Sequence, residues 1–191
     1  FLAGIPVRVG FDRKWAWTLT HRLADDKALG ERHEVEYNLH LINRLGISVS
    51  SIPPVCLPRH SEEEQSLSQL LERLSVRDSQ VLVAVHPWTS NPTKQWPLSR
   101  FRELITRLQV HPTHVVVIGG REEQDLVPYV VEASQPGLLD LVGRLSLRQL
   151  AALLRRVRVL ISNDSGPVHV AAAVGTPTVV LFGGTEAATG P

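Results

Sequence analysis

The sequence predicts an α/β fold built on a Rossmann-like, doubly wound parallel sheet. From residue 81 onward, apolar runs typical of buried parallel strands alternate five times with amphipathic segments at helical spacing. This alternation is typical of a parallel sheet with helices on both faces. Polar, glycine-containing segments follow several of these runs, at the strand ends where doubly wound sheets bind their ligands.

The elements of this regular region follow one another with short connections. Strands are expected at residues 81–85, 115–118, 138–142, 157–161 and 178–182. Helices are expected at residues 98–108, 122–133, 147–156 and 168–174. Ser146 is a suitable N-cap for the third of these helices, and Asp164 or Ser165 for the fourth, because their side chains accept hydrogen bonds from free N–H groups.

The first 80 residues are less regular. Residues 5–11 alternate like a short strand, and residues 31–45 have the apolar spacing of a helix. Ser61 precedes three glutamates, which predicts the capped start of a helix running to about residue 74. We therefore predict three parts, namely the end of a first domain at 1–50, a linker or crossover with a helix at 51–80, and a second domain at 81–191.

Composition excludes several classes of protein. With 43% hydrophobic and 20% charged residues the chain is an ordinary globular one, and its net charge of +1 gives no field that favours nucleic acid. A single cysteine excludes an internal disulfide and a multi-cysteine metal cluster. No apolar stretch has the length of a membrane span and no secretory signal is recognisable, so we expect a cytoplasmic protein. The 191 residues begin at Phe1 and include no methionine, so we expect a piece of a longer protein.

The segment after the expected strand 157–161 carries the strongest chemical signal. It reads N-D-S-G-P-V-H, and a proline and a glycine suit the first turn of a helix that a ligand approaches closely. Free N–H groups at this helix start make an anion site fit for phosphate, and His169 lies one turn further on. A merely well-capped helix is the structural alternative. A serine hydrolase is disfavoured, since Asp164 and Ser165 are adjacent and cannot easily flank one imidazole.

Two other strand ends carry polar residues. After the strand 81–85, Thr89 and Ser90 can donate hydrogen bonds to phosphate, and Lys94 supplies one of only three lysine charges in the chain. The alternative is that Trp88 and Trp96 merely pack this loop. After the strand 115–118, the run G-G-R-E-E offers a carboxylate for a ribose or a base, or simply an acidic first turn.

Together the three segments resemble glycosyltransferase family 9, the ADP-heptose:lipopolysaccharide heptosyltransferases. The family shows a His-Pro segment ending in K-x-W-P, then G-G-x-x-E, then N-D-S-G-x-x-H-x-A-A-A, all matched within residues 81–191. Residues 1–50 are similar to the end of the family's first domain. Trp88 departs from the family pattern, which often has glycine there, and its ring can close part of a donor pocket or stack on a sugar or base.

The resemblance implies a GT-B architecture, in which 1–50 ends the N-terminal acceptor domain and 81–191 is the nucleotide-sugar donor domain. It implies that Thr89, Ser90 and Lys94 meet the donor diphosphate and that Glu123 meets the nucleoside. It places Asp164, Ser165, Gly166 and His169 around the donor sugar and phosphates. The family works without a bound metal, with Lys94 stabilising the leaving group. Its general base, an aspartate of the first domain, is expected outside this chain, so the chain alone is expected to be inactive.

The resemblance therefore predicts an inverting, metal-independent glycosyltransferase that moves a heptose to a lipopolysaccharide core or another surface-glycan acceptor. The expected partners are a nucleotide-sugar donor, ADP-heptose, and a lipid-linked or oligosaccharide acceptor, with no cofactor, no metal and no nucleic acid. Peripheral contact with the cytoplasmic face of the inner membrane is also expected. The alternatives are a transferase of a different sugar, a nucleotide-sugar binding module without catalysis, and a Rossmann-like domain for another nucleotide.

Overall fold

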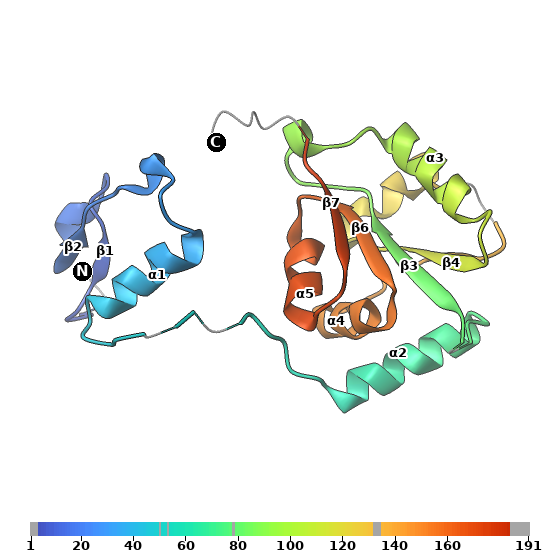
Figure 1. Ribbon diagram of the computed structural model, residues 1–191, viewed down its shortest axis with the longest axis horizontal. Helices are drawn as coiled ribbons and strands as arrows, with labels where there is room; N and C mark the ends of the chain where they lie inside the picture. Colours follow the sequence, from blue (N-terminus) through green and yellow to red (C-terminus); the bar gives the residue numbers. More distant parts are fainter. Residues whose placement is uncertain (1–3, 50, 53, 78, 132–134, 184–191) are drawn as a thin grey trace. The chain divides into compact units, whose positions relative to one another are not determined.

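The computed structural model describes residues 4–49, 51–52, 54–77, 79–131 and 135–183. The chain divides into two compact units, Phe1–Pro54 and Val55–Gly190 (Figure 1). The division lies within the stretch predicted to be a linker.

The first unit contains a two-stranded parallel sheet and one α-helix. Strand β1 (Val9–Phe11) pairs with β2 (His21–Leu23), and the 3-10 helices η1 (Ala16–Thr18) and η2 (Lys27–Leu29) follow these strands. Helix α1 (Glu34–Asn43) starts later than the predicted residue 31. A capping box sets this start, because the His33 side chain accepts from the N–H of Val35 and Glu36 reaches back to the N–H of His33.

The second unit confirms the predicted doubly wound parallel sheet. Its strands are β3 (Val81–His86), β4 (Thr113–Val117), β5 (Leu138–Asp140), β6 (Val159–Asn163) and β7 (Thr178–Leu181). All pairs are parallel and the order is β5-β4-β3-β6-β7. Strands β4 and β5 follow β3 on one side of the sheet, and β7 follows β6 on the other side. The topological switch point therefore lies between β3 and β6.

Helices cover both faces of this sheet (Figure 1). On one face, α2 (Ser61–Arg73), α4 (Leu147–Arg156) and α5 (Gly166–Val174) enclose a core. On the other face, α3 (Leu98–Leu108) and η4 (Arg121–Tyr129) enclose a second one. Buried strand residues alternate between the two cores, as Val116 faces the first and its neighbours Val115 and Val117 face the second.

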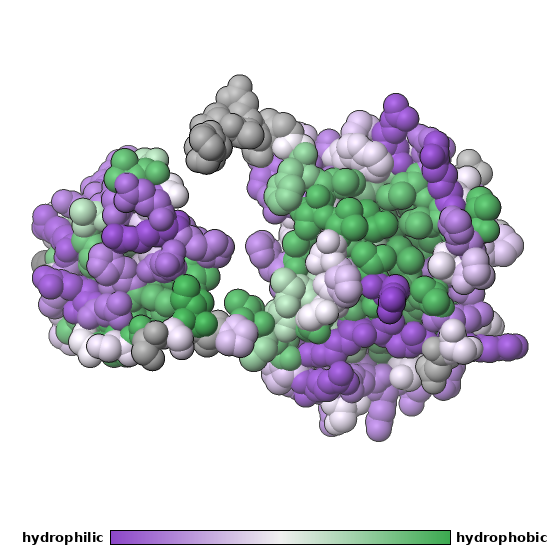
Figure 2. Space-filling view, in the orientation of Figure 1, coloured by the Kyte–Doolittle hydropathy of each residue, from purple (hydrophilic) through white to green (hydrophobic). Residues whose placement is uncertain are grey.

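The second face is less covered beside β7. Val179 is 48% exposed and Phe182 is 75% exposed, while Ile161 and Leu181 are partly buried there. Figure 2 shows a broad hydrophobic surface on this side of the second unit.

Three local predictions have definite outcomes. Ser146 is confirmed as the N-cap of α4, with its Oγ accepting from the N–H of Gln149 at 3.2 Å. Ser61 is the first residue of α2 rather than its cap, because His60 holds the extended cap conformation. The helix expected at 122–133 forms as the 3-10 helix η4, which contains Pro128 and ends at Tyr129, while residues 132–134 lie outside the described residues. Proline lacks the N–H that an α-helix needs.

Among the described residues, no helix is long and apolar enough to cross a membrane.

Candidate functional site

The carboxyl ends of β3 and β6 meet at the switch point with three buried polar residues. His86 ends β3 and is 5% exposed, while Ser162 and Asn163 end β6 and are fully buried. His86 lies opposite Ser162 in the strand register. Polar side chains at the ends of apolar strands are retained only where they find partners, so their contacts show how the strand-end loops are held.

Asn163 fixes the loop that carries Lys94. Its Oδ1 accepts from the N–H of Trp96 at 3.0 Å, and its Nδ2 donates to the carbonyl of Pro87 at 2.8 Å. Both ends of the 87–96 loop are thereby tied to β6. The Trp96 ring also meets the ring of Phe101 edge-on, with centroids 4.9 Å apart, which joins the loop to α3.

Lys94 and Asp164 form an ion pair across the switch point. Lys94 ends the short helix η3 (Pro92–Lys94), and its Nζ lies 2.5 Å from Oδ2 of Asp164. Asp164 is therefore engaged by a lysine rather than by the start of α5, so the expectation that it caps that helix is wrong. Gly183 lies against this loop, since a Cβ there would come within 2.7 Å of the Lys94 backbone.

Ser165 occupies the N-cap position of α5, but its hydroxyl does not cap the helix. Its Oγ instead lies 3.0 Å from Nδ1 of His86, 3.0 Å from Oγ of Ser162 and 3.1 Å from the carbonyl oxygen of Asn163. The side-chain cap expected of Ser165 is thus wrong, because buried partners at the strand ends hold the hydroxyl. Nothing lies within 4 Å of where a Cβ of Gly166 would be, so the space before the helix start is open.

Glu123 comes from the third strand-end loop. Its Oε2 accepts from the N–H of Gly120 at 2.6 Å and lies 3.7 Å from Nε2 of His86. Burial raises the pKa of Glu123, but its interactions with His86 and the hydrogen bond from the N–H of Gly120 outweigh this effect, so the pKa lies below its usual value. A Cβ on Gly119 would come within 2.6 Å of this carboxylate and 2.9 Å of the buried Trp88 ring, so a side chain at this position would displace one or both.

Trp88 packs beneath this site and does not enter it. The ring is 3% exposed and meets His86 edge-on, with centroids 6.1 Å apart and planes at 81°. The expectation that it closes a pocket or stacks on a ligand is therefore wrong, and its role as loop packing is the one observed. Its Nε1 is buried without a hydrogen-bond partner among the described residues.

A cavity of about 380 Å³ opens where the three loops meet. It brings together five of the predicted site residues, and its lining includes Thr89, Ser90, Glu123, Ser165 and Gly166. Lys94 and Asp164 do not line the cavity, but Asp164 directly precedes Ser165, which does. His169 is exposed on α5 and does not line it either.

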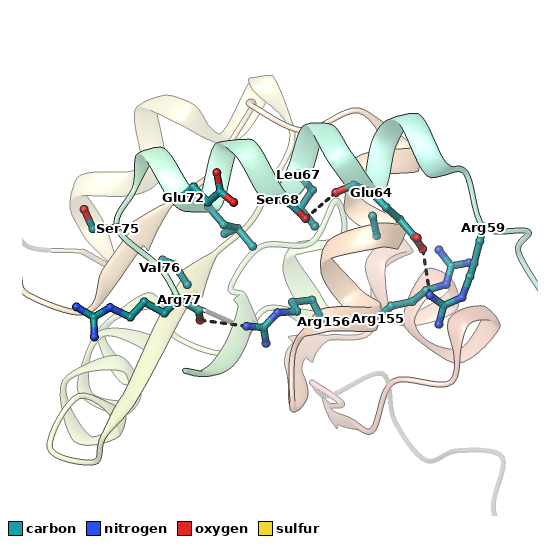
Figure 3. Close-up of a pocket in the computed structure, with 12 residues that line it drawn as sticks. Arg59, Glu64, Leu67, Ser68, Glu72, Ser75, Val76, Arg77, Arg155 and Arg156 are labelled. Atoms are coloured by element: carbon teal, nitrogen blue, oxygen red, sulfur yellow. Dashed lines mark hydrogen bonds and ion pairs between the residues drawn. The ribbon is translucent and has the colours of Figure 1, made fainter. Parts of the chain in front are cut away.

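A larger cavity, of about 670 Å³, lies between α2 and α4 (Figure 3). Ser75, Val76 and Arg77, the residues leading to β3, line one end of it, so it lies toward the amino ends of the strands. Ligands of doubly wound sheets bind at the carboxyl ends, at the switch point. The smaller cavity is therefore the candidate site. Within the described ranges, no group of three or more His, Cys, Asp or Glu side chains is placed to hold a metal ion.

Comparisons with known proteins show the family of this chain. The family model described as glycosyltransferase family 9 (heptosyltransferase) matches residues 1–191. The chain belongs to glycosyltransferase family 9. The match extends over both units, so the resemblance of all three strand-end segments to this family is confirmed.

Individual relatives are about twice as long as this chain. Lipopolysaccharide heptosyltransferase 3 of Escherichia coli is 29% identical over 181 residues, which cover 90% of this chain and 49% of the relative. A glycosyltransferase family 9 crystal structure from Veillonella parvula DSM 2008 has a TM-score of 0.82 at 24% identity, covering 96% of this chain and 53% of that one. The structure of the E. coli ADP-heptose lps heptosyltransferase II has a TM-score of 0.71 at 22% identity, covering 94% and 57%. The chain thus spans about half the length of the relatives it matches.

These likenesses confirm the fold expectation, since the structural neighbours are family 9 glycosyltransferases of the GT-B type. Sequence reasoning missed the part played by the buried residues His86, Ser162 and Asn163, which contact the loops of the candidate site. The available signal was that two otherwise apolar strands end in polar residues. The sequence does not show that these two strands are neighbours in the sheet.

Proposed function

We propose that the complete protein is an inverting glycosyltransferase that moves a heptose from ADP-heptose to a lipopolysaccharide core or another surface-glycan acceptor. One observation carries the proposal, namely the convergence of three strand-end loops at the switch point of a family 9 chain. The printed names of the relatives support the donor and the acceptor, because they are lipopolysaccharide heptosyltransferases and one is named for ADP-heptose.

The diphosphate of the donor is proposed to bind at the start of α5. The N–H groups there lack a serine cap, and the helix dipole favours a negative charge. Thr89 and Ser90 line the same cavity and offer hydroxyl donors, while the Lys94 ammonium lies beside it through its contact with Asp164. When the bond between the sugar and the diphosphate breaks, negative charge grows on the leaving ADP, and these donors stabilise it without requiring a metal ion.

The nucleoside is proposed to lie on the opposite side of the cavity, against Glu123. Its Oε2 is engaged by Gly120 and His86, which leaves Oε1 to accept from a ribose hydroxyl. The sugar would then lie toward Asp164 and His169, beyond Gly166. The general base that activates the acceptor is proposed to lie outside this chain, and for that reason the chain alone is proposed to be inactive.

The remaining parts of the proposal concern partners and location. No cofactor is required, since ADP-heptose is a substrate. The acceptor is lipid-linked or an oligosaccharide, and the complete protein acts in the cytoplasm, in peripheral contact with the inner membrane. A non-catalytic nucleotide-sugar binding module is the second candidate, because this chain holds the donor site while the expected base lies elsewhere. A transferase of a different sugar is the alternative within the class.

Calorimetry on the complete protein tests the donor and the independence from metal together. We expect ADP to bind with EDTA present, and added Mg²⁺ to change the affinity little. Binding that appears only with Mg²⁺ would contradict the proposal. Turnover of ADP-heptose with a lipopolysaccharide acceptor separates the enzyme from the binding module, and parallel measurements with UDP and GDP sugars test the different-sugar alternative.

Asp164→Asn should separate a structural role from a role in the reaction. Asp164 does not cap α5, and its pair with Lys94 is only partly buried, so the melting temperature should change little and the free energy of unfolding by about 1 kcal/mol or less. Turnover should fall by up to about 100-fold, because Lys94 loses the carboxylate that holds it in place. Wild-type melting together with wild-type turnover would remove Asp164 from the site.

A further inference from the structure

His86 contacts both of the other strand-end loops of the site. Its Nδ1 lies 3.0 Å from Oγ of Ser165, at the start of α5, and its Nε2 lies 3.7 Å from Oε2 of Glu123. The side chain is 5% exposed and lies edge-on against Trp88. A single buried ring therefore joins the two sides of the cavity.

The chemistry of the two contacts gives each ring nitrogen a definite role. An ionised carboxylate only accepts hydrogen bonds, so the Glu123 carboxylate at 3.7 Å favours the tautomer with a proton on the nitrogen that faces it. In a neutral imidazole the other nitrogen is then an acceptor, and the single hydroxyl proton of Ser165 goes to Nδ1 at 3.0 Å rather than to the carbonyl of Asn163 at 3.1 Å. The position of the Glu123 carboxylate thus determines how His86 holds Ser165.

The contact with Ser165 also decides whether the start of α5 is open. A serine at the N-cap ordinarily turns its oxygen onto the N–H groups of the first turn. Here the backbone of Ser165 has the extended cap conformation, with φ −157° and ψ 172°, yet its side chain makes no cap hydrogen bond. Because partners at the strand ends hold the hydroxyl, it does not cover the helix start. Pro167 has no N–H and the N–H of Val168 donates to the carbonyl of Ser165 at 3.1 Å, so in this first turn it is the N–H of Gly166 that faces an anion.

We propose that His86 is a positioning residue that couples the nucleoside side of the donor site to its diphosphate side, through Glu123 and Ser165. This inference rests on the proposed function, because it takes the two sides of the cavity as parts of one nucleoside diphosphate site. A ligand bound at Glu123 restrains the His86 ring, and through Ser165 this keeps the start of α5 open. A ligand bound at the start of α5 restrains the ring from the other side, and this positions Glu123. Such coupling between two sites is reciprocal.

Two half-ligands, adenosine and inorganic pyrophosphate, test the coupling on the complete protein. Adenosine carries no phosphate, yet Ser165→Ala should weaken its binding by about fivefold or more. Ser90→Ala is the matched control, because it removes a hydroxyl of the cavity wall that, among the described residues, forms no hydrogen bond with His86. This control should weaken pyrophosphate and leave adenosine affinity unchanged. By reciprocity, Glu123→Gln should weaken pyrophosphate, which does not reach Glu123.

Substitutions of His86 by amides of two lengths separate the two ring nitrogens. The amide of asparagine reaches the place of Nδ1, so His86→Asn should keep the affinity for pyrophosphate near that of the wild type and lose adenosine affinity. The amide of glutamine reaches the place of Nε2, so His86→Gln should show the reverse. A purely structural role would lower both affinities equally in both variants, and that result would overturn the proposal.

The outcomes distinguish the inference from the function on which it rests. If the wild-type protein binds ADP but Ser165→Ala leaves adenosine affinity intact, the coupling is wrong and the donor site stands. If the wild-type protein binds neither ADP nor the half-ligands, the donor site is wrong and the coupling falls with it. The Ser165 and Glu123 variants leave His86 in place, so the test holds even if the His86 variants fail to fold.

Discussion

Lys94→Ala should lower the turnover of the complete enzyme about 100- to 1,000-fold while leaving its affinity for adenosine close to that of the wild type. The ammonium lies beside the open start of α5, paired with Asp164 at 2.5 Å. Its attraction to the donor grows as the diphosphate leaves, so it acts more on the transition state than on the ground state. Losing one such donor typically costs about 2.7–4 kcal/mol of barrier.

Steady-state kinetics and adenosine calorimetry on the same protein check this expectation. Lys14→Ala, which removes an exposed lysine of the first unit, is the matched control and should leave turnover unchanged. The double variant Lys94→Ala/Asp164→Asn removes the carboxylate that Lys94→Ala leaves unpaired. If the double variant regained most of the turnover, the loss would arise from the stranded Asp164 charge rather than from the missing cation.

Asn163→Ala should cause a large decrease in the free energy of unfolding. The side chain is fully buried and satisfies both the N–H of Trp96 and the carbonyl of Pro87. Each buried group left unpaired costs about 1–3 kcal/mol. We expect the urea midpoint of the second unit to fall accordingly, and turnover to fall with it even at temperatures where the variant stays folded, because the Lys94 loop loses its tie to β6.

Asn91→Ala is the matched control for this experiment. Asn91 belongs to the same loop and its Oδ1 accepts from the N–H and the hydroxyl of Thr93, but it is exposed. Water can replace those hydrogen bonds, so the stability should fall less than in Asn163→Ala. Equal losses in the two variants would show that the buried hydrogen bonds of Asn163 do not hold the loop.

The local sequence pattern determined most of the secondary structure of the second unit. The helices α3 and α4 have the bounds predicted from their apolar spacing, because helix formation depends on residues three and four apart. The Ser146 cap was predictable for the same reason, since its partner Gln149 is three residues away. The helix predicted around Pro128 forms as a 3-10 helix, a distinction that the helical pattern alone does not make.

The sequence also determined the family and which loops form the candidate site, because strand-end motifs keep their spacing along the chain. Only the tertiary structure decided how the side chains within those loops pair. Asp164 has the sequence position of a helix cap, yet it binds Lys94, 70 residues away, and Ser165 turns from its own helix to His86, 79 residues away. These partners are neighbours because the strand order places β3 beside β6. A hydrogen bond between residues far apart in the sequence depends on the strand order, and no local sequence pattern encodes that order. In addition, a hydroxyl binds more strongly to buried partners than to the exposed end of a helix.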